Sequence, residues 1–153
     1  MVEKKRVSVF GGRDIPSDIY QDTIEIGERL ADQGYVVFCG GGKGVMEAIS
    51  KGVKNKNGVI VGVLKGQNLN EANPYLTVSV ATGIGIARNA ILAYNCDVAI
   101  AIAGQYGTIS EIAYALQLEK TVIGYNTWDI ESVVKADSPI DVLNKLEEKM
   151  SYV

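Results

Sequence analysis

The sequence predicts an α/β fold, because short apolar runs alternate along the chain with patterns of helical spacing. Several of the apolar runs are continuous, which is typical of strands that are buried on both faces of a parallel sheet. Glycine-rich segments at residues 40–44 and 104–108 stand where a predicted strand meets a helix. Together these observations predict a three-layer, doubly wound, Rossmann-like domain. We expect a mostly parallel sheet of about six or seven strands with helices on both faces.

The first half of the chain alternates between strands and helices. Predicted strands cover residues 6–10, 35–39 and 59–64. A first predicted helix covers residues 15–33, and a second follows the junction at residues 40–48 and ends at Lys51 or Gly52. The first helix carries apolar residues along one face and ends at Gly34. Strands and helices that alternate at this rhythm are typical of right-handed crossovers between parallel strands.

A polar segment at residues 66–74 separates the two halves. It contains proline and lacks periodicity, so we expect a loop or a crossover that returns across the sheet. The second half then contributes predicted strands at residues 76–80, 97–102 and 121–125, and predicted helices at residues 82–94, 108–118 and 138–150. Ser138 and Pro139 suit the N-cap and first turn of the last helix.

The composition fits one domain, residues 1–153. Hydrophobic residues make up 47% of the chain and charged residues 22%, which is enough apolar material for a sizeable core. The formal net charge is −3 and the isoelectric point is about 5.0. No general basic field is therefore present to hold a nucleic-acid backbone, and nucleic acid is not an expected partner unless a local groove provides one.

The sequence indicates a cytoplasmic protein. The charged N-terminal segment, residues 1–6, leads directly into a predicted strand, so we expect no signal peptide. No run of about 18 apolar residues is present, so we expect no membrane partner. Cys39 and Cys96 lie far apart, in or beside apolar segments, which predicts buried thiols and no disulfide.

The chain contains no histidine. This excludes Ser-His-Asp and Cys-His nucleophilic sites, histidine-ligated zinc and histidine acid–base chemistry. Any catalysis then depends on carboxylates, Lys, Arg, Tyr, Ser or Thr, and we predict no metal site.

The two glycine-rich segments predict where a ligand binds. In open α/β sheets the ligand lies outside the carboxyl ends of the strands, where the strand order reverses. The first N–H groups of a helix lack partners within the helix and carry partial positive charge, so an anion such as phosphate suits this place. The glycines at 40–44 match neither the Walker pattern nor GxGxxG, and they could instead only permit a tight turn and close packing. The predicted phosphate- or nucleotide-binding residues are Gly11, Gly12, Gly41, Gly42, Lys43, Gly44, Gly104, Gln105, Gly107 and Thr108.

Two charged residues stand out beside these glycines. Thr108 and Glu111 have the spacing of a capping box, in which Glu111 would only cap a helix. Glu111 could instead face the crevice, holding ribose hydroxyls or supporting charge on a reacting sugar. Arg88 would either lie at the surface, in a salt bridge or along apolar neighbours, or present a planar fork to phosphate. Weaker candidates are Arg13, Lys43 and Glu47.

The order and spacing of these motifs resemble the LONELY GUY superfamily. The residues that carry the resemblance are Gly41-Gly42, Gly44-Val45-Met46, Arg88 and Gly104-x-x-Gly107-Thr108-x-x-Glu111. Members include cytokinin riboside monophosphate phosphoribohydrolases, many of them once labelled lysine decarboxylases. Gly-Val-Met-Glu-Ala at residues 44–48 and Arg88-Asn89 look closer to a short branch with molybdenum cofactor carrier proteins and relatives of DNA-processing protein A.

The resemblance implies a catalytic pair, Arg88 and Glu111, and a phosphate cradle at Gly104, Gly107 and Thr108. It also implies homo-oligomers, commonly dimers or tetramers. The chain differs from the hydrolases of the superfamily, because Asn89 replaces a lysine and Gln105 replaces a glycine. Two functions stay open. One is hydrolysis of the N-glycosidic bond of a nucleoside 5′-monophosphate, which requires no cofactor. The other is non-catalytic carriage of the molybdenum cofactor, with molybdopterin or a nucleotide as the small phosphorylated ligand.

Overall fold

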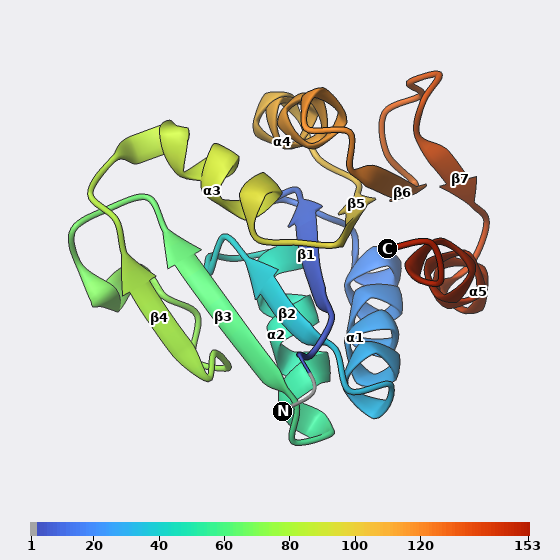
Figure 1. The fold of residues 1–153 in the computed structure, drawn as a ribbon. Coiled ribbons are helices and arrows are strands. Elements are labelled where there is room, and N and C mark those ends of the chain that lie inside the picture. Colours follow the sequence, from blue (N-terminus) through green and yellow to red (C-terminus); the bar gives the residue numbers. More distant parts are fainter. Residues whose placement is uncertain (1–2) are drawn as a thin grey trace.

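The computed structural model describes residues 3–153 and contains a seven-stranded sheet with helices on both faces (Figure 1). The strands are β1 (Arg6–Gly11), β2 (Val36–Cys39), β3 (Val59–Leu64), β4 (Val78–Ala81), β5 (Val98–Ile102), β6 (Thr121–Tyr125) and β7 (Val134–Ala136). The helices are α1 (Ser17–Asp32), α2 (Val45–Asn55), α3 (Arg88–Tyr94), α4 (Tyr106–Gln117) and α5 (Pro139–Met150), with short 3-10 helices η1 (Leu69–Glu71) and η2 (Gly85–Ala87). The predicted three-layer α/β fold is confirmed. The first two residues of the charged N-terminal segment lie outside the described residues.

The strand order is β4-β3-β2-β1-β5-β6-β7, and every neighbouring pair is parallel. The chain builds outward from β1 to β4 and then returns to the other side of β1 with β5. The order therefore reverses between β1 and β5, where Val9 pairs with Ile100. The carboxyl ends of these two strands form the switch point at which α/β sheets bind ligands.

The return across the sheet is made by η2 and α3, which lie between β4 and β5. The expectation of a crossover at residues 66–74 is wrong, because this segment leads only to β4, the neighbour of β3. The predicted helix at 82–94 begins at Arg88 instead. Gly83 and Gly85 have positive φ angles of 66° and 68°, which interrupt a helix before that residue.

Buried residues form two cores, one on each face of the sheet. One core packs β1, β2 and β5 against α1, α2 and α5, and the other packs α3 and α4 against the opposite face. All five residues of β5 are buried. Cys39 and Cys96 are buried free thiols, as expected. In the described part of the chain, no helix has the length and apolarity to cross a membrane.

Helices α1 and α2 approach each other closely through two glycines. A Cβ atom at Gly27 would lie 2.6 Å from the carbonyl oxygen of Ile49. A Cβ atom at Gly52 would run into the carbonyl oxygen of Ile24. Both positions therefore need glycine because another backbone occupies the space of a side chain. The start of α2 is held beside the loop that follows β1 by a separate bond, from Val45 N to Gly12 O at 2.9 Å.

Candidate functional site

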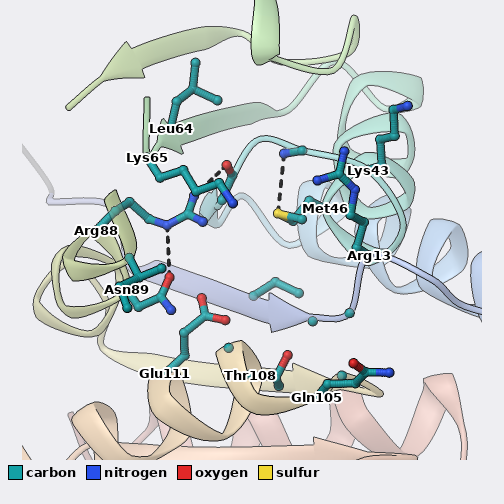
Figure 2. A pocket seen from close by; sticks show the side chains of 18 of the residues that line it. Arg13, Lys43, Met46, Leu64, Lys65, Arg88, Asn89, Gln105, Thr108 and Glu111 are labelled. Carbon is teal, nitrogen blue, oxygen red and sulfur yellow. Dashed lines mark hydrogen bonds between the residues drawn. The ribbon is translucent and has the colours of Figure 1, made fainter. Parts of the chain in front are cut away.

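A cavity of about 730 Å³ opens at the carboxyl ends of β1, β2, β3 and β5 (Figure 2). It brings together residues that the sequence places far apart. The predicted residues that line it are Gly11, Gly12, Gly42, Lys43, Arg88, Gly104, Gln105, Gly107, Thr108 and Glu111, together with the weaker candidate Arg13. The cavity lies between the two glycine-rich segments.

Two of the predicted glycines, Gly41 and Gly44, do not line the cavity. Gly44 has φ of 68°, and a Cβ atom there would run into the carbonyl oxygens of Gly12 and Arg13. The next amide, that of Val45, donates to Gly12 O at 2.9 Å. The amide of Gly41 faces Cys39 Sγ at 3.4 Å. At these two positions glycine serves close packing, the alternative that the sequence left open.

The start of α4 leaves backbone donors free. Gln105 is the N-cap, and Ile109 N donates to its carbonyl oxygen at 3.1 Å. Within the described residues the three preceding amides, those of Tyr106, Gly107 and Thr108, donate to no protein acceptor. The loop that leads into α4 packs closely against the loop after β1, because a Cβ atom at Gly12 would lie 2.9 Å from Gly104 Cα. Free amides and the helix dipole together can hold an anion here.

The capping-box interpretation of Glu111 is wrong. Helix α4 starts two residues before Thr108, so Thr108 lies in the first turn and Glu111 follows one turn later. Glu111 is only 7% exposed, and its carboxyl group has no hydrogen-bond partner among the described residues. Figure 2 shows this group in the cavity, on the side of Arg88 and Asn89.

Burial makes the Glu111 carboxyl a weak acid. Desolvation raises its pKa from 4.5 to about 8, although the charge of Arg88 acts in the opposite direction. The group is therefore mostly protonated at pH 7 and ionises as the pH rises through about 8. Among the described residues no fully buried side-chain oxygen lacks a partner, so the unpartnered Glu111 oxygens are accessible from the cavity. A carboxyl group that is mostly desolvated in this way is unfavourable for folding and favourable for binding a polar ligand.

Arg88 is held by backbone oxygens from two strand ends. Its Nη1 donates to the carbonyl oxygens of Gly40 and Val63, at 2.7 and 2.5 Å, and its Nε donates to Asn89 Oδ1 at 3.0 Å. Desolvation lowers the pKa of its guanidinium group. The alternative that Arg88 forms a salt bridge at the surface is therefore wrong. Arg88 joins the ends of β2 and β3 to α3 and lines the cavity at the same time.

Asn89 stands where the hydrolases of the superfamily have lysine, and it is used internally. It is 6% exposed, accepts from Arg88 Nε, and donates from Nδ2 to Ser110 Oγ at 3.1 Å. The side chain thereby joins α3 to α4. It fixes the guanidinium group and adds no charge of its own.

Sequence reasoning missed Lys65, which follows β3 and lines the cavity. The available signal was its place directly after a predicted strand, but no motif marks it. The lining therefore contains four basic residues and three acidic ones. The basic residues are Arg13, Lys43, Lys65 and Arg88, and the acidic residues are Asp14, Glu71 and Glu111. Glu47, a weaker candidate, does not line the cavity and accepts a hydrogen bond from Tyr20 Oη at 3.0 Å. Among the described residues, no group of three or more Cys, Asp or Glu side chains is placed to hold a metal ion.

Solved structures with the same fold cover nearly the whole chain. The molybdenum cofactor binding protein from Rippkaea orientalis has a TM-score of 0.91 and 29% sequence identity, over 97% of this chain and 98% of that chain. The molybdenum cofactor carrier protein from Chlamydomonas reinhardtii has a TM-score of 0.89 and 26% identity, over 97% of this chain and 99% of that chain. DNA processing protein A from Helicobacter pylori, at 20% identity and a TM-score of 0.65 over 95% of this chain and 72% of that chain, shares the fold.

Sequence relatives place the chain in a family. An uncharacterized protein from Archaeoglobus fulgidus is 38% identical over 117 residues, 76% of this chain and 77% of that protein. A probable cytokinin riboside 5′-monophosphate phosphoribohydrolase from Oryza sativa subsp. japonica is 30% identical over 113 residues, 71% of this chain but only 50% of that protein. These likenesses confirm the superfamily and the branch that the motifs predicted. The model of the SLOG cluster4 family matches residues 4–150, and the chain belongs to this family.

Proposed function

We propose that the chain binds a phosphorylated, nucleotide-like ligand in this cavity, with the phosphate at the start of α4. The free amides of Tyr106, Gly107 and Thr108 support this position. Arg13, Lys43, Lys65 and Arg88 add positive charge to the lining. The names of the relatives agree with such a ligand, because both a riboside monophosphate and the molybdenum cofactor carry phosphate.

The reaction that the geometry supports best is hydrolysis of the N-glycosidic bond of a nucleoside 5′-monophosphate. The observation that carries it is the unpartnered Glu111 carboxyl, buried in the cavity one turn beyond the phosphate site. Glu111 lies three helical steps beyond Thr108, which corresponds to about 4.5 Å along the axis. A ribose ring spans a gap of this size, so its hydroxyls would reach Glu111 while its phosphate stays at α4.

The residues divide the reaction between them. The amides of α4 and the Arg88 guanidinium group hold the phosphate and fix the ribose. The ionised form of Glu111, which is the minor form at pH 7 because the pKa is about 8, binds the ribose hydroxyls and stabilises the positive charge that develops on the sugar as the bond to the base breaks. Water adds to C1′, the departing base takes up a proton, and the products are the free base and ribose 5-phosphate.

A second function, non-catalytic carriage of the molybdenum cofactor, is favoured by Asn89. Asn89 is uncharged where the hydrolases resembled by this sequence have lysine, so the cavity lacks that cation. The Asn89 side chain instead binds Arg88 and Ser110. The likeness to the molybdenum cofactor binding protein of Rippkaea orientalis also covers 97% of the chain. The residues fit such a cargo, since the start of α4 would hold its phosphate and the buried Glu111 carboxyl would pair with N–H groups of its pterin.

We also propose that the chain forms a homo-oligomer, a dimer or tetramer. Exposed apolar side chains stand at both ends of α3: Ile84 at 50% and Ile86 at 80% precede it, and Tyr94, its last residue, is 65% exposed. Large apolar side chains left exposed around one helix are a candidate interface. Ile86 also lines the cavity, so a second copy on this face would lie at the cavity rim.

The first test is incubation of the wild-type chain with a panel of nucleoside 5′-monophosphates, with free base followed by chromatography. We expect base release from at least one nucleotide. Glu111→Gln should lower the rate by about 100-fold or more, because the carboxylate that stabilises the sugar cation is lost. Glu47→Gln is the matched control, since Glu47 lies outside the cavity, and it should retain the wild-type rate.

The carrier predicts a different result. No base would be released from any nucleotide, while nucleotides or molybdopterin would raise the thermal midpoint of unfolding. That outcome would contradict hydrolysis of these substrates and support carriage. If no base is released and no ligand raises the thermal midpoint of unfolding, both functions are contradicted.

A further inference from the structure

We propose that Thr127 and Trp128 hold the anion-binding loop, residues 103–108, so that its N–H groups and not its carbonyl oxygens face the ligand. The inference rests on the phosphate site of the proposed function. Neither side chain lines the cavity, so both act through the loop as positioning residues. They come from the segment between β6 and β7, which no sequence motif marks.

Two consecutive side chains bind alternate carbonyl groups of the loop. Thr127 Oγ1 donates to Ala103 O at 2.6 Å. Trp128 Nε1 donates to Gln105 O at 3.0 Å. Both oxygens are thereby engaged by groups outside the cavity, and Gln105 O accepts in addition from Ile109 N at 3.1 Å. Because a carbonyl oxygen carries partial negative charge, a peptide that rotated toward the ligand would repel phosphate.

The loop needs such support because its conformation is unfavourable. Ala103 has φ of 51° and Gly104 has φ of 96°. Alanine rarely adopts a left-handed conformation, which costs roughly 1–3 kcal/mol when the surroundings impose it. The amide of Ala103 donates to Tyr125 O at 3.3 Å, so contacts from β6 and from Thr127 hold Ala103 on its two polar sides.

The surrounding residues fix the two donors in place. A Cβ atom at Gly124 would lie 2.9 Å from Thr127 Cγ2, so the glycine makes room for the threonine methyl group over β6. The Trp128 ring stacks on Tyr106, the first residue of α4, with ring centroids 6.5 Å apart and planes at 25°. The segment therefore contacts the loop at Ala103, Gln105 and Tyr106.

The test measures the affinity for inorganic phosphate by isothermal titration calorimetry. Thr127→Val keeps the shape of the side chain and removes the hydroxyl, and it should weaken phosphate binding by about tenfold. Thr127→Ser keeps the hydroxyl and should restore near wild-type affinity. Trp128→Phe keeps an aromatic ring, removes the N–H donor and should also weaken binding. The matched control is Thr23→Val, which removes a buried bond from Oγ1 to Ile19 O inside α1 and should leave the affinity unchanged.

A second measurement distinguishes positioning from general destabilisation. Thr127→Val should weaken binding of adenosine 5′-monophosphate more than binding of adenosine, because only the nucleotide places a phosphate at the loop. Equal loss for both ligands, or wild-type phosphate affinity in Thr127→Val and Trp128→Phe, would overturn the inference and leave the proposed function intact. If the wild-type chain binds no phosphate, the proposed function and this inference both fail.

Discussion

At the scale of single residues, Glu111 makes the stability of the chain depend on pH. In the unfolded chain its pKa is near the ordinary 4.5, whereas burial raises the pKa in the folded chain to about 8. Between these two values the unfolded state has lost the proton and the folded state has kept it. The unfolded state then binds fewer protons, so the free energy of unfolding falls as the pH rises through this window.

We therefore expect Glu111→Gln to stabilise the chain progressively, relative to wild type, between about pH 5 and about pH 8, by a few kcal/mol at the upper end. Urea unfolding of both chains at several pH values measures this difference. Below about pH 4 the two chains should differ little in their pH dependence. A constant difference across the whole range would show that Glu111 ionises like an exposed glutamate.

Gly107 separates stability from binding at one position. A Cβ atom there would meet no atom within 4 Å, and the residue lies in the first turn of α4. Gly107→Ala should therefore raise the free energy of unfolding by about 0.5–1 kcal/mol. The same methyl group should weaken phosphate binding, because Gly107 lines the cavity. Thermal unfolding measures the change in stability, and calorimetry measures the change in phosphate affinity. An affinity that rises together with the stability would argue against a phosphate at this position.

At the scale of elements, a glycine-to-alanine substitution at the contact between α1 and α2 should lower the stability of the chain, whereas the same change at Gly107 should raise it. Gly52→Ala places a methyl group against the backbone of Ile24, which cannot move without separating the helices. We expect the free energy of unfolding to fall by about 3 kcal/mol or more. Denaturant unfolding beside Gly107→Ala makes the comparison. Equal effects of the two substitutions would show that helix propensity, and not helix contact, decides the result.

The elements that the sequence predicted are those whose signal is local. Strands such as β5 and helices such as α1 have continuous apolar runs or amphipathic spacing, so their pattern identified them. The start of α4 was misplaced because Thr108 and Glu111 have capping-box spacing, while the true boundary depends on the loop geometry at Gly104. Strand β7 has three residues and only Ala136 is buried, too little pattern to recognise.

At the scale of the whole molecule, the position of the cavity follows from the order of the strands and does not depend on the identity of any side chain. Alternating strands and helices predicted a reversal point, and the cavity lies at the carboxyl ends of β1 and β5. The partners of Arg88 were beyond prediction, because two of them are backbone carbonyls that no residue type identifies, those of Gly40, directly after β2, and of Val63 in β3. Lys65 was missed for a related reason, since only the fold brings it to the cavity.

Assembly is a prediction of the whole molecule. Multi-angle light scattering should give a mass of two or four times the chain mass of 16.4 kDa. Ile86→Glu should shift the mass to that of one chain, because the charge would be buried in an interface. Ile140→Glu is the matched control, since Ile140 is 47% exposed on α5, and should leave the assembly intact. A wild-type mass of 16.4 kDa would contradict the oligomer.

The hydrogen bonds of Arg88 have a consequence for how this chain can change under selection. Because the guanidinium group joins strand ends as well as lining the cavity, selection for folding alone would keep Arg88 even if ligand binding were lost. Glu111 has no such second task, and its burial opposes folding at neutral pH. In a library drifting under selection for solubility, Glu111 should be replaced early and Arg88 late, so the survival of Glu111 in a lineage would mark a working site.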